Sequence, residues 1–393
     1  MKFDSVKWQN NGKLRLLIMV GTRPEIIRLS CVIRLCREHF DCILAHTGQN
    51  YDYNLNGIFF KDLELAAPEV YLDAAGGSLG ETMGNIIASS YELMKELAPD
   101  ALLILGDTNS CLCAVSAKRL HIPVFHMEAG NRCWDERLPE ETNRRIVDII
   151  SDVNLPYSQS ARDNLLACGL PAGRVFVTGS PMAEVLDHYM DKISRSDIHE
   201  RLGTQKGGYI LLSAHREENV DDMHSLRLMF SAINSMAEKY DMPVIYSCHP
   251  RSLQRLEAAG ITLDKRIRVC EPFSFTDYNR LQADAFCVVS DSGTLPEESS
   301  YYTSIGKAFP AVSIRTSTER PEALERACFV LSGIEEEGLL QAVELARSLA
   351  EEELHGTPVP DYLDKNVSTR VVTLIQSMTG RVSTVIRGRD EDR

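Results

Sequence analysis

The sequence predicts an α/β protein with two doubly wound domains and a cleft between them, and three observations lead to this prediction. The chain has 393 residues, which is longer than one domain usually is. Short apolar runs alternate with longer amphipathic segments, which is typical of parallel strands covered by helices on both faces. The alternation starts near residue 14 and resumes after residue 207, so two domains of similar size are expected.

The first half contains six apolar runs of strand length with helix-like segments between them, and we place it at residues 1–190. The predicted strands are Leu14–Val20, Cys42–His46, Ala101–Leu105, Ile122–Met127, Val153–Leu155 and Val175–Val177. The predicted helices are Glu25–His39, Leu79–Leu97, Asn109–His121 and Glu140–Ser151.

The second half, placed at residues 191–363, shows the same pattern after a polar, glycine-containing stretch, Asp191–Gly208, which we interpret as the linker. The predicted strands are Tyr209–Leu212, Pro243–Ser247, Ile267–Cys270, Phe286–Val289 and Ala311–Ile314. The predicted helices are Met223–Tyr240, Thr276–Ala283 and Gly338–Leu349. A final helix is expected at Ser368–Met378, within a last segment at 364–393.

The amino-acid composition limits the kinds of binding partner and the cellular compartment that can be expected. The formal net charge of −14 argues against nucleic acid, which needs a basic face, but not against an anionic small molecule held by a few arginines and helix N-termini. The first apolar run has strand length, far below the ~20 residues of a membrane-spanning helix, so neither a signal peptide nor membrane insertion is expected. The eleven scattered cysteines lack zinc spacing and indicate reduced thiols in the cytoplasm, with no metal site.

The stretch at residues 125–145, FHMEAGNRCWDERLPEETNRR, is the densest group of titratable side chains. It holds five carboxylates, several arginines and one histidine where a strand gives way to a helix. Glu128 directly follows the strand, at the edge of a parallel sheet where ligands bind. Glu140 and Glu141 also fit ordinary helix pairing, because Arg144 and Arg145 lie four residues further on. We interpret the stretch as the acid–base wall of an active site.

Two other strand ends in the first half carry candidate residues. Arg23 lies in GTRPE, where a glycine lets a phosphate approach the backbone and an arginine pairs with it. Pro24 at a helix start is equally explained as a first-turn proline. Asp107 lies in GDTNS and is either the N-cap of a helix or a catalytic carboxylate.

In the second half, His215 and His249 each follow a predicted strand, and each has an arginine nearby. Both fit an anion-binding or proton-transfer role, although a lone histidine is more often structural. The strongest phosphate signal is Ser292-Gly293-Thr294, where a strand runs into a helix whose N–H groups favour a diphosphate, or simply into a capped helix. Glu298, one turn into that helix, suits ribose hydroxyls. Neither a Walker A motif nor a dinucleotide fingerprint is present, which argues against an NTPase or an NAD enzyme.

Eight short motifs in order make the chain resemble the non-hydrolysing UDP-N-acetylglucosamine 2-epimerase family. They are GTRPE, GDTNS, EAGNR, PEETNR, AHREE, CHPR, SDSGT and TERPE, and they span Gly21 to Glu322. The resemblance implies a glycosyltransferase-B-like fold, in which two Rossmann-like domains face a central cleft that holds UDP. It also implies that the final helix packs back on the first domain and that the protein forms a homodimer.

Within the family, the motif sequences are similar to those of one branch. The enzymes of this branch convert UDP-2-acetamido-2,6-dideoxy-L-talose to UDP-N-acetyl-L-fucosamine for capsule or O-antigen synthesis. Asn131-Arg132-Cys133 and Thr294 stand where the plain N-acetylglucosamine enzymes usually have other residues. The loop at Gly48–Tyr51 lacks the Gln-His pair of the regulated members. The stretch Tyr301–Phe309 looks longer than this branch usually has. The alternative substrate is UDP-N-acetylglucosamine, which would give UDP-N-acetylmannosamine.

The resemblance implies a reaction without a cofactor, in which UDP leaves C1 while C2 loses its proton, and both are then restored. It assigns catalysis to Asp107, Glu128, Glu140 and His215. It assigns binding of UDP and the sugar to Arg23, Arg144, His249, Ser292, Gly293, Thr294, Glu298 and Arg320. Three other classes compete: a glycosyltransferase of the same fold, a hydrolysing epimerase and a non-catalytic sugar-nucleotide sensor. The acidic chain without a basic acceptor face argues against the glycosyltransferase, and the full set of acid–base groups argues against the sensor. Only product analysis separates the hydrolysing epimerase.

Overall fold

The computed structural model of the protein describes residue 3 and residues 6–48, 60–136, 138–216, 219, 222–248 and 250–387. The chain divides into two compact units. The first unit comprises Met1–Val185 and Asp364–Arg393, and the second comprises Leu186–Leu363. The corresponding boundaries predicted from the sequence lie after residues 190 and 363. The stretch expected to be a linker, at 191–208, contains the end of helix α7 (Met182–Ser194) and the short helix α8 (Ile198–Leu202).

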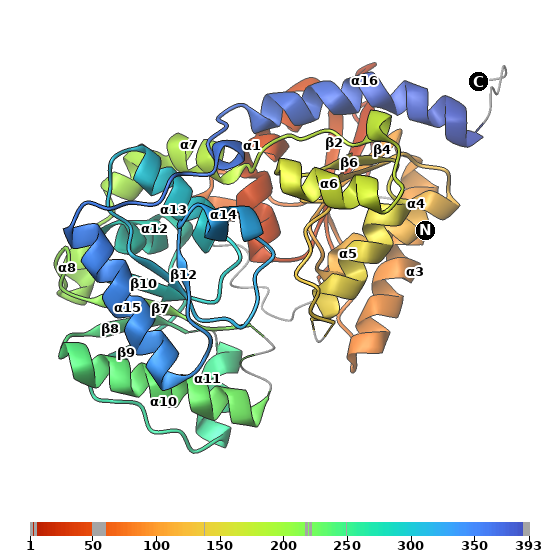
Figure 1. Cartoon of the computed structure of the whole chain (residues 1–393). Helices are drawn as coiled ribbons and strands as arrows, with labels where there is room; N and C mark the ends of the chain where they lie inside the picture. The colour runs from red at the N-terminus through yellow and green to blue at the C-terminus, as the bar shows by residue number, and fades with distance from the viewer. Residues whose placement is uncertain are drawn as a thin grey trace. The chain divides into compact units, whose positions relative to one another are not determined.

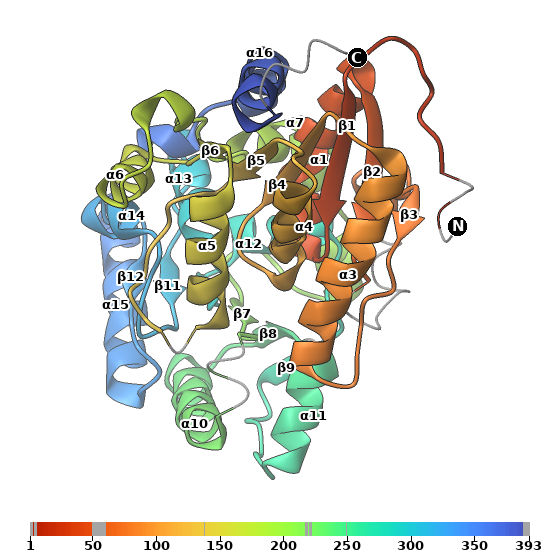
Figure 2. The ribbon, with the colours of Figure 1, turned by 90° about the vertical axis from the view of Figure 1, so that its right-hand side faces the viewer.

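The first unit is built on a six-stranded parallel sheet, of which Figure 1 labels β2, β4 and β6. The order of its strands is β3-β2-β1-β4-β5-β6, and Figure 2 labels them all. Its strands are β1 (Arg15–Val20), β2 (Asp41–His46), β3 (Val70–Tyr71), β4 (Ala101–Leu105), β5 (Val124–Met127) and β6 (Val153–Leu155). Its helices include α1 (Arg23–His39), α3 (Leu79–Leu97), η1 (Asn109–Leu112), α4 (Cys113–Arg119), α5 (Pro139–Ile150), α6 (Gln159–Ala167) and α16 (Val367–Arg387).

Helices cover the apolar strands of this sheet. Leu17 and Met19 of β1 share one core cluster with Ile86 and Leu93 of α3, and Figure 2 shows α3 and α4 beside each other in front of the strands. Helix α16 packs against α1 within the same unit. The backbone N–H of Ser368 at its start donates to Glu184 of α7 (2.8 Å).

The second unit repeats this plan with the order β12-β11-β10-β7-β8-β9. Its strands are β7 (Ile210–Ser213), β8 (Val244–Ser247), β9 (Ile267–Cys270), β10 (Cys287–Ser290), β11 (Ala311–Ser313) and β12 (Val330–Leu331). Its longer helices are α10 (Met223–Tyr240), α11 (Pro250–Ala258), α12 (Phe275–Asp284), α13 (Leu295–Ser304) and α15 (Glu336–Glu351), and α14 (Pro321–Glu325) is short.

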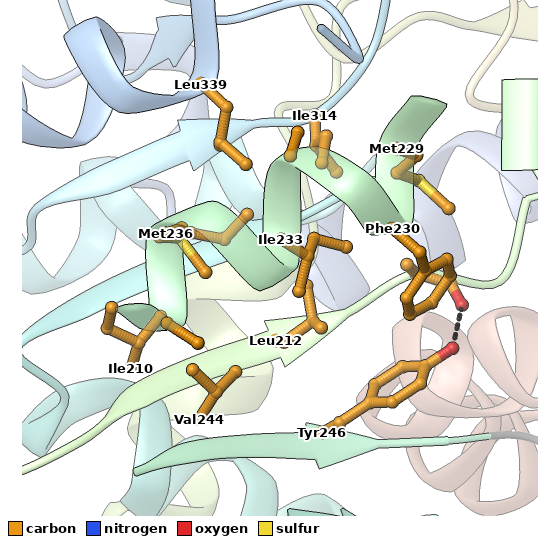
Figure 3. Close-up of a cluster of buried hydrophobic side chains, with 14 of the residues drawn as sticks. Ile210, Leu212, Met229, Phe230, Ile233, Met236, Val244, Tyr246, Ile314 and Leu339 are labelled. Atoms are coloured by element: carbon orange, nitrogen blue, oxygen red, sulfur yellow. Dashed lines mark hydrogen bonds between the residues drawn. The ribbon is translucent and has the colours of Figure 1, made fainter. Parts of the chain in front are cut away.

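Figure 3 shows how α10 closes one face of the second sheet. Phe230 and Ile233 of α10 lie over Leu212 of β7, and all three side chains are fully buried. The hydroxyl of Tyr246 on β8 donates to the carbonyl of Ala214 (2.9 Å), which satisfies the only polar atom of that ring inside an apolar cluster. This core fixes the carboxyl end of β7, just before His215.

Both sheets follow one strand order when strands are counted within each unit: 3-2-1-4-5-6. In such a sheet the direction of winding reverses between strands 1 and 4, and the loops at that point form the usual ligand site of the fold. The reversal lies between β1 and β4 in the first unit and between β7 and β10 in the second. The predicted doubly wound class is confirmed.

Some element predictions were wrong. Val175–Val177 is not a strand, because its pairing with β6 stops after one isolated bridge between Asn154 and Val175. Strands β3 and β12 were not predicted, since two residues are too short to form an apolar run. The final helix extends to Arg387, nine residues beyond the predicted end at Met378 (387 − 378). Among the described residues, no helix is long and apolar enough to cross a membrane.

Candidate active site

The loops that follow β1 and β4 are joined by the carboxylate of Glu25, which lies in the first turn of α1 and is 1% exposed. Its Oε2 accepts hydrogen bonds from the Gly21 N–H (2.8 Å) and the Ser110 hydroxyl (2.9 Å). Its Oε1 accepts from the hydroxyls of Thr22 (2.9 Å) and Thr108 (2.5 Å). Burial raises the pKa of this carboxyl to about 7, although all four hydrogen bonds favour the ionised form.

Asp107 follows β4 and forms an ion pair with Arg144 of α5. The guanidinium uses both Nε (3.0 Å) and Nη2 to reach Oδ2 of Asp107. The Asn143 side chain donates to the Asp107 carbonyl (3.0 Å), so two neighbouring residues of one helix hold the loop. The N-cap alternative for Asp107 was wrong, because Thr108 occupies the N-cap position of η1. The Asp107 side chain is 20% exposed, which leaves it accessible to a ligand.

Glu141 supports Arg144 from within α5. It pairs with Arg145 four residues on (3.1 Å), as the helix spacing predicted, and also with Arg144 three residues on (2.6 Å), which was predicted as the partner of Glu140. This pair is buried, since Glu141 is 1% exposed and the Arg144 side chain 5%. Cys133 lies beside them, with its Sγ 3.4 Å from Oε2 of Glu141. Glu140 is half-buried in the first turn of the same helix.

Glu128 follows β5 and forms an ion pair with Arg28 of α1, and both side chains are 9% exposed. Its backbone is left-handed, with φ of 62°, which is unusual for a glutamate and turns the chain sharply after the strand. A Cβ at Gly106 would lie 3.3 Å from Oε2 of Glu128, so any other residue there would make this carboxylate shift by a small amount. The carboxylates of Asp107 and Glu128 therefore project from adjacent strand ends.

The loop that carries Glu128 is held from below by Asp148 of α5. This fully buried carboxylate accepts from the Gly130 N–H (3.2 Å) and from Arg132 Nη1 (2.7 Å), and it lies 3.1 Å from Nδ1 of His126. Burial alone would raise the pKa of Asp148, but the hydrogen bond and charge of His126 and the charge of Arg132 lower it overall. A Cβ at Gly130 would meet the Ala161 carbonyl at 2.2 Å, which requires glycine there.

The reversal point of the second unit has its own buried carboxylate, Asp291, directly after β10. Its Oδ2 accepts from the backbone N–H groups of His215 and Arg216, both at 2.8 Å. Its Oδ1 lies 3.3 Å from Nδ1 of His215. The His215 side chain is 46% exposed, so its ring is anchored on one side and open on the other. Asn219 further ties Asp291 to the Ile314 carbonyl (3.2 Å).

The predicted phosphate turn precedes α13, whose N-cap is Thr294. The hydroxyls of Ser292 and Thr294 lie 2.9 Å apart, and the Thr294 hydroxyl donates to Oε1 of Glu298 (3.0 Å). The other oxygen of Glu298 accepts from Gln282 (2.8 Å). A Cβ at Gly293 would lie 3.1 Å from a guanidinium nitrogen of Arg216, so this arginine reaches over the turn.

The remaining binding candidates are placed as follows. Arg320 is buried and donates to Glu297 of α13 (2.7 Å), so it braces the helix behind the phosphate turn. Arg23 is half-buried at the start of α1. His249 lies outside the described residues, as do Gln49, Asn50 and Tyr51 of the loop after β2. Among the described residues, no group of three or more histidine, cysteine or carboxylate side chains is placed to hold a metal ion.

Sequence reasoning assigned no role to Glu25, Arg28, Asp148 or Asp291. An acidic residue in a first helical turn is common for reasons of the helix dipole, so Glu25 carried no special signal. Arg28 and Glu128 are 100 residues apart, and nothing in either local pattern links them. Asp291 was quoted within its motif, but only the structure shows that its carboxylate holds the His215 loop.

Two six-stranded parallel sheets with interleaved helices define a two-domain, glycosyltransferase-B-like protein, and solved structures of epimerases share this architecture. The family model described as UDP-N-acetylglucosamine 2-epimerase matches residues 34–376. The chain belongs to this family, whose members are isomerases.

Three relatives illustrate the similarity. A solved UDP-N-acetylglucosamine 2-epimerase from Rickettsia bellii is 40% identical, with 95% of this chain and 99% of that chain covered and a TM-score of 0.86. The Methanocaldococcus jannaschii UDP-GlcNAc 2-epimerase, solved with UDP-GlcNAc and UDP, is 30% identical, with 93% and 100% covered and a TM-score of 0.86. A UDP-2,3-diacetamido-2,3-dideoxy-D-glucuronate 2-epimerase from Pseudomonas aeruginosa is 32% identical over 81% of this chain and 88% of its own length.

Proposed function

We propose that this protein inverts C2 of a UDP-linked 2-acetamido sugar by eliminating UDP and adding it back. The observation that carries the proposal is the set of carboxylates at the carboxyl edge of the first sheet. Asp107 and Glu128 end adjacent strands, and Glu140 lies in the first turn of α5, next to the residues that hold Asp107. Inversion needs proton transfer on two faces of C2, so one carboxylate is not enough.

In the proposed reaction, a base in the first unit takes the C2 proton as the C1–O bond breaks, and UDP leaves with the bonding electrons. The bound products are a 2-acetamidoglycal and UDP. UDP oxygen then bonds to C1 again, and an acid delivers a proton to the opposite face of C2. Arg144 and Arg28 orient the carboxylates of Asp107 and Glu128. Asp107, Glu128, Glu140 and His215 form the proposed catalytic set.

We assign UDP binding mainly to the second unit. The N–H groups at the start of α13, together with the hydroxyls of Ser292 and Thr294, suit the diphosphate. A ribose hydroxyl would replace the Thr294 hydroxyl as the donor to Glu298, which already accepts a hydrogen bond at this oxygen. The further binding candidates are Arg23, Arg144, His249, Gly293 and Arg320. Charge neutralisation by the cationic side chains among these candidates would make UDP a better leaving group.

For the sugar, we propose UDP-2-acetamido-2,6-dideoxy-L-talose, which would give UDP-N-acetyl-L-fucosamine. The support is the sequence at residues 131–133 and at Thr294, which is similar to that of the family branch that forms UDP-N-acetyl-L-fucosamine. The second candidate is UDP-N-acetylglucosamine, and the names of the Rickettsia and Methanocaldococcus relatives favour it. The Pseudomonas relative, named for a third sugar, supports the idea that the family accepts different rings.

The test is to offer both sugar nucleotides in parallel and follow C2 inversion by NMR. Conversion of the 6-deoxy-L-talo sugar alone supports the proposed substrate, and conversion of UDP-N-acetylglucosamine alone replaces it with the second candidate. Release of free UDP and sugar would instead indicate a hydrolysing epimerase, and transfer to an added acceptor a glycosyltransferase. Binding of both compounds without any conversion would leave a sensor as the function.

Two further parts of the proposal concern the state of the protein in the cell. We propose a cytoplasmic location, and the support is that all eleven cysteines are free thiols. We also propose a homodimer, which rests on the family resemblance. Light scattering coupled to gel filtration should give twice the mass of one chain, and the mass of a single chain would remove the dimer from the account.

A further inference from the structure

Glu25 connects the two loops that meet at the reversal point of the first sheet. Two of its hydrogen-bond donors, Gly21 and Thr22, belong to the loop after β1, and the other two, Thr108 and Ser110, lie after β4. The hydroxyls of Thr108 and Ser110 also lie 2.8 Å from each other. A single side chain thus makes four contacts across two strand ends that are far apart in sequence.

The position of these loops gives the connection its meaning. The first loop leads directly into Arg23, and Asp107 immediately precedes Thr108. Beta strands β1 and β4 are paired neighbours in the sheet, so their loops leave it side by side. Any movement of one loop against the other would change the separation of the Arg23 and Asp107 backbones. The Glu25 hydrogen bonds oppose that movement.

The chemistry of the four donors is also informative. Three of them are hydroxyls, which can turn and accept a hydrogen bond instead of donating one, while the Gly21 N–H can only donate. A glutamine at this position can therefore keep all four contacts, with its oxygen toward Gly21 and its amide toward the two threonines. An alanine keeps none. The titratable neighbours that interact electrostatically with Glu25 are the thiols of Cys111 and Cys113.

We propose that Glu25 is a positioning residue for the epimerase reaction, which clamps the loop leading to Arg23 against the loop carrying Asp107. Glu25 acts through these two residues rather than on the substrate. The inference rests on the proposed function, because it takes Asp107 as catalytic and Arg23 as substrate-binding. The clamp keeps its geometry with a neutral side chain, so its contribution comes from hydrogen bonds and not from charge.

The experiment compares Glu25→Ala, Glu25→Gln, the double variant Thr108→Val/Ser110→Ala and the combined triple variant, each as the full chain. Glu38→Ala is the matched control, because Glu38 lies on the same helix and is exposed. Turnover, KM, UDP affinity by calorimetry and the melting temperature are measured for each. The wild type is assayed in the same series for C2 inversion.

Glu25→Ala is expected to lower kcat on the order of 100-fold, since a misplacement of about 1 Å has effects of that size. UDP affinity is expected to fall much less than turnover, because only Arg23 is displaced while the groups assigned to the diphosphate turn and the ribose lie in the second unit. Glu25→Gln should recover most of the lost turnover. The Thr108→Val/Ser110→Ala variant should lose turnover similarly, and the triple variant should lose little more than Glu25→Ala alone, because one shared clamp is broken in each.

Three results would overturn the inference. One is a kcat for Glu25→Ala within twofold of the wild type. Another is a Glu25→Gln variant as impaired as Glu25→Ala although it remains folded, which would assign the effect to charge. The third is a triple variant whose loss equals the product of the separate losses. If Glu25→Ala does not fold, the glutamine and hydroxyl variants decide. A wild type without C2 inversion removes the proposed function and the clamp together, whereas an active wild type isolates failure of the clamp.

Discussion

At the reversal points of the two sheets, different hydrogen-bond donors hold the loops together. In each unit a buried carboxylate joins the loop after the first strand to the loop after the fourth. Glu25 in the first unit accepts from three hydroxyls and one backbone N–H. Asp291 in the second unit accepts from two backbone N–H groups and lies beside the His215 ring.

This difference teaches what each unit can tolerate. Hydroxyls can reverse their hydrogen bonds, so the first unit accepts a neutral or an ionised clamp. Backbone N–H groups cannot reverse, so the loop after β7 requires an acceptor oxygen at the Asp291 position. The first unit also presents carboxylates at its sheet edge, and the second presents hydroxyls, an arginine and a histidine. We therefore propose that the carboxylates of the first unit transfer protons at C2, and that the second unit binds most of the diphosphate and adds His215 to the catalytic set.

The largest effect is expected from Glu128→Gln in the first unit. The amide keeps the shape but cannot take a proton from C2, so turnover should fall roughly 10²–10⁴-fold, the usual contribution of general acid–base catalysis. Calorimetric UDP affinity should stay close to that of the wild type, because the groups assigned to the diphosphate turn and the ribose lie in the other unit. An unchanged kcat would remove Glu128 from the catalytic set.

The next effect is expected from Asp291→Ala, which leaves the N–H groups of His215 and Arg216 without their acceptor. Each such loss costs about 1–3 kcal/mol where the group stays buried, so the free energy of unfolding should drop by roughly 2–6 kcal/mol. Urea denaturation measures this drop, and UDP binding should weaken with it. Asp197→Ala is the control, since Asp197 is exposed and paired only at the surface. Equal stability of the two variants would contradict the role of Asp291.

The carboxylate of Glu25 should make the free energy of unfolding depend on pH. In the unfolded chain Glu25 ionises near its ordinary pKa of 4.5, but in the fold its pKa is about 7. Between these values the folded protein holds a proton that the unfolded chain has lost, so stability falls as the pH rises through this window. The total loss is at most about 3 kcal/mol by pH 8.

Glu25→Gln cannot ionise and should escape this loss. Urea denaturation should show that the free energy of unfolding of this variant, relative to that of the wild type, is higher at pH 8 than at pH 5. Glu38→Gln, on the exposed side of the same helix, should show no such gain. A stability difference between Glu25→Gln and the wild type that does not vary with pH would mean that Glu25 is ionised throughout.

The smallest effect is expected from Thr294→Val in the second unit. The valine keeps the shape and loses the hydroxyl that contacts Ser292 and Glu298. One neutral hydrogen bond contributes about 0.5–1.5 kcal/mol, so the UDP dissociation constant should rise roughly 2- to 13-fold with kcat nearly unchanged. A large loss of kcat with normal UDP affinity would contradict the assignment of Thr294 to UDP binding.

Much of the fold follows from sequence alone, because buried parallel strands leave continuous apolar runs and helices leave amphipathic ones. Ala101–Leu105 and Leu79–Leu97 have the predicted bounds in the structure. Very short edge strands such as β3 leave no such pattern. The run at Val175–Val177 has strand character but only one bridge partner, and local pattern does not reveal how far a pairing continues.

The candidate site was predictable where a charged side chain follows a strand, as at Asp107 and Glu128. Partners were not predictable, because they come from other elements. Arg28 reaches Glu128 from α1, and Glu25 reaches Ser110 across two loops. Glu141 shows the limit most clearly, since its helical spacing indicated Arg145 as a partner but neither the pairing with Arg144 nor the burial of Glu141.

The central claim, elimination and re-addition through proton transfer at C2, is tested most directly by isotope exchange. The wild-type protein is incubated in heavy water with each of the two candidate sugar nucleotides, and the product is examined by NMR and mass spectrometry. The account predicts one deuterium at C2 of the inverted product, because the returning proton comes from a group in exchange with solvent. An inverted product that carries hydrogen at C2 would contradict it.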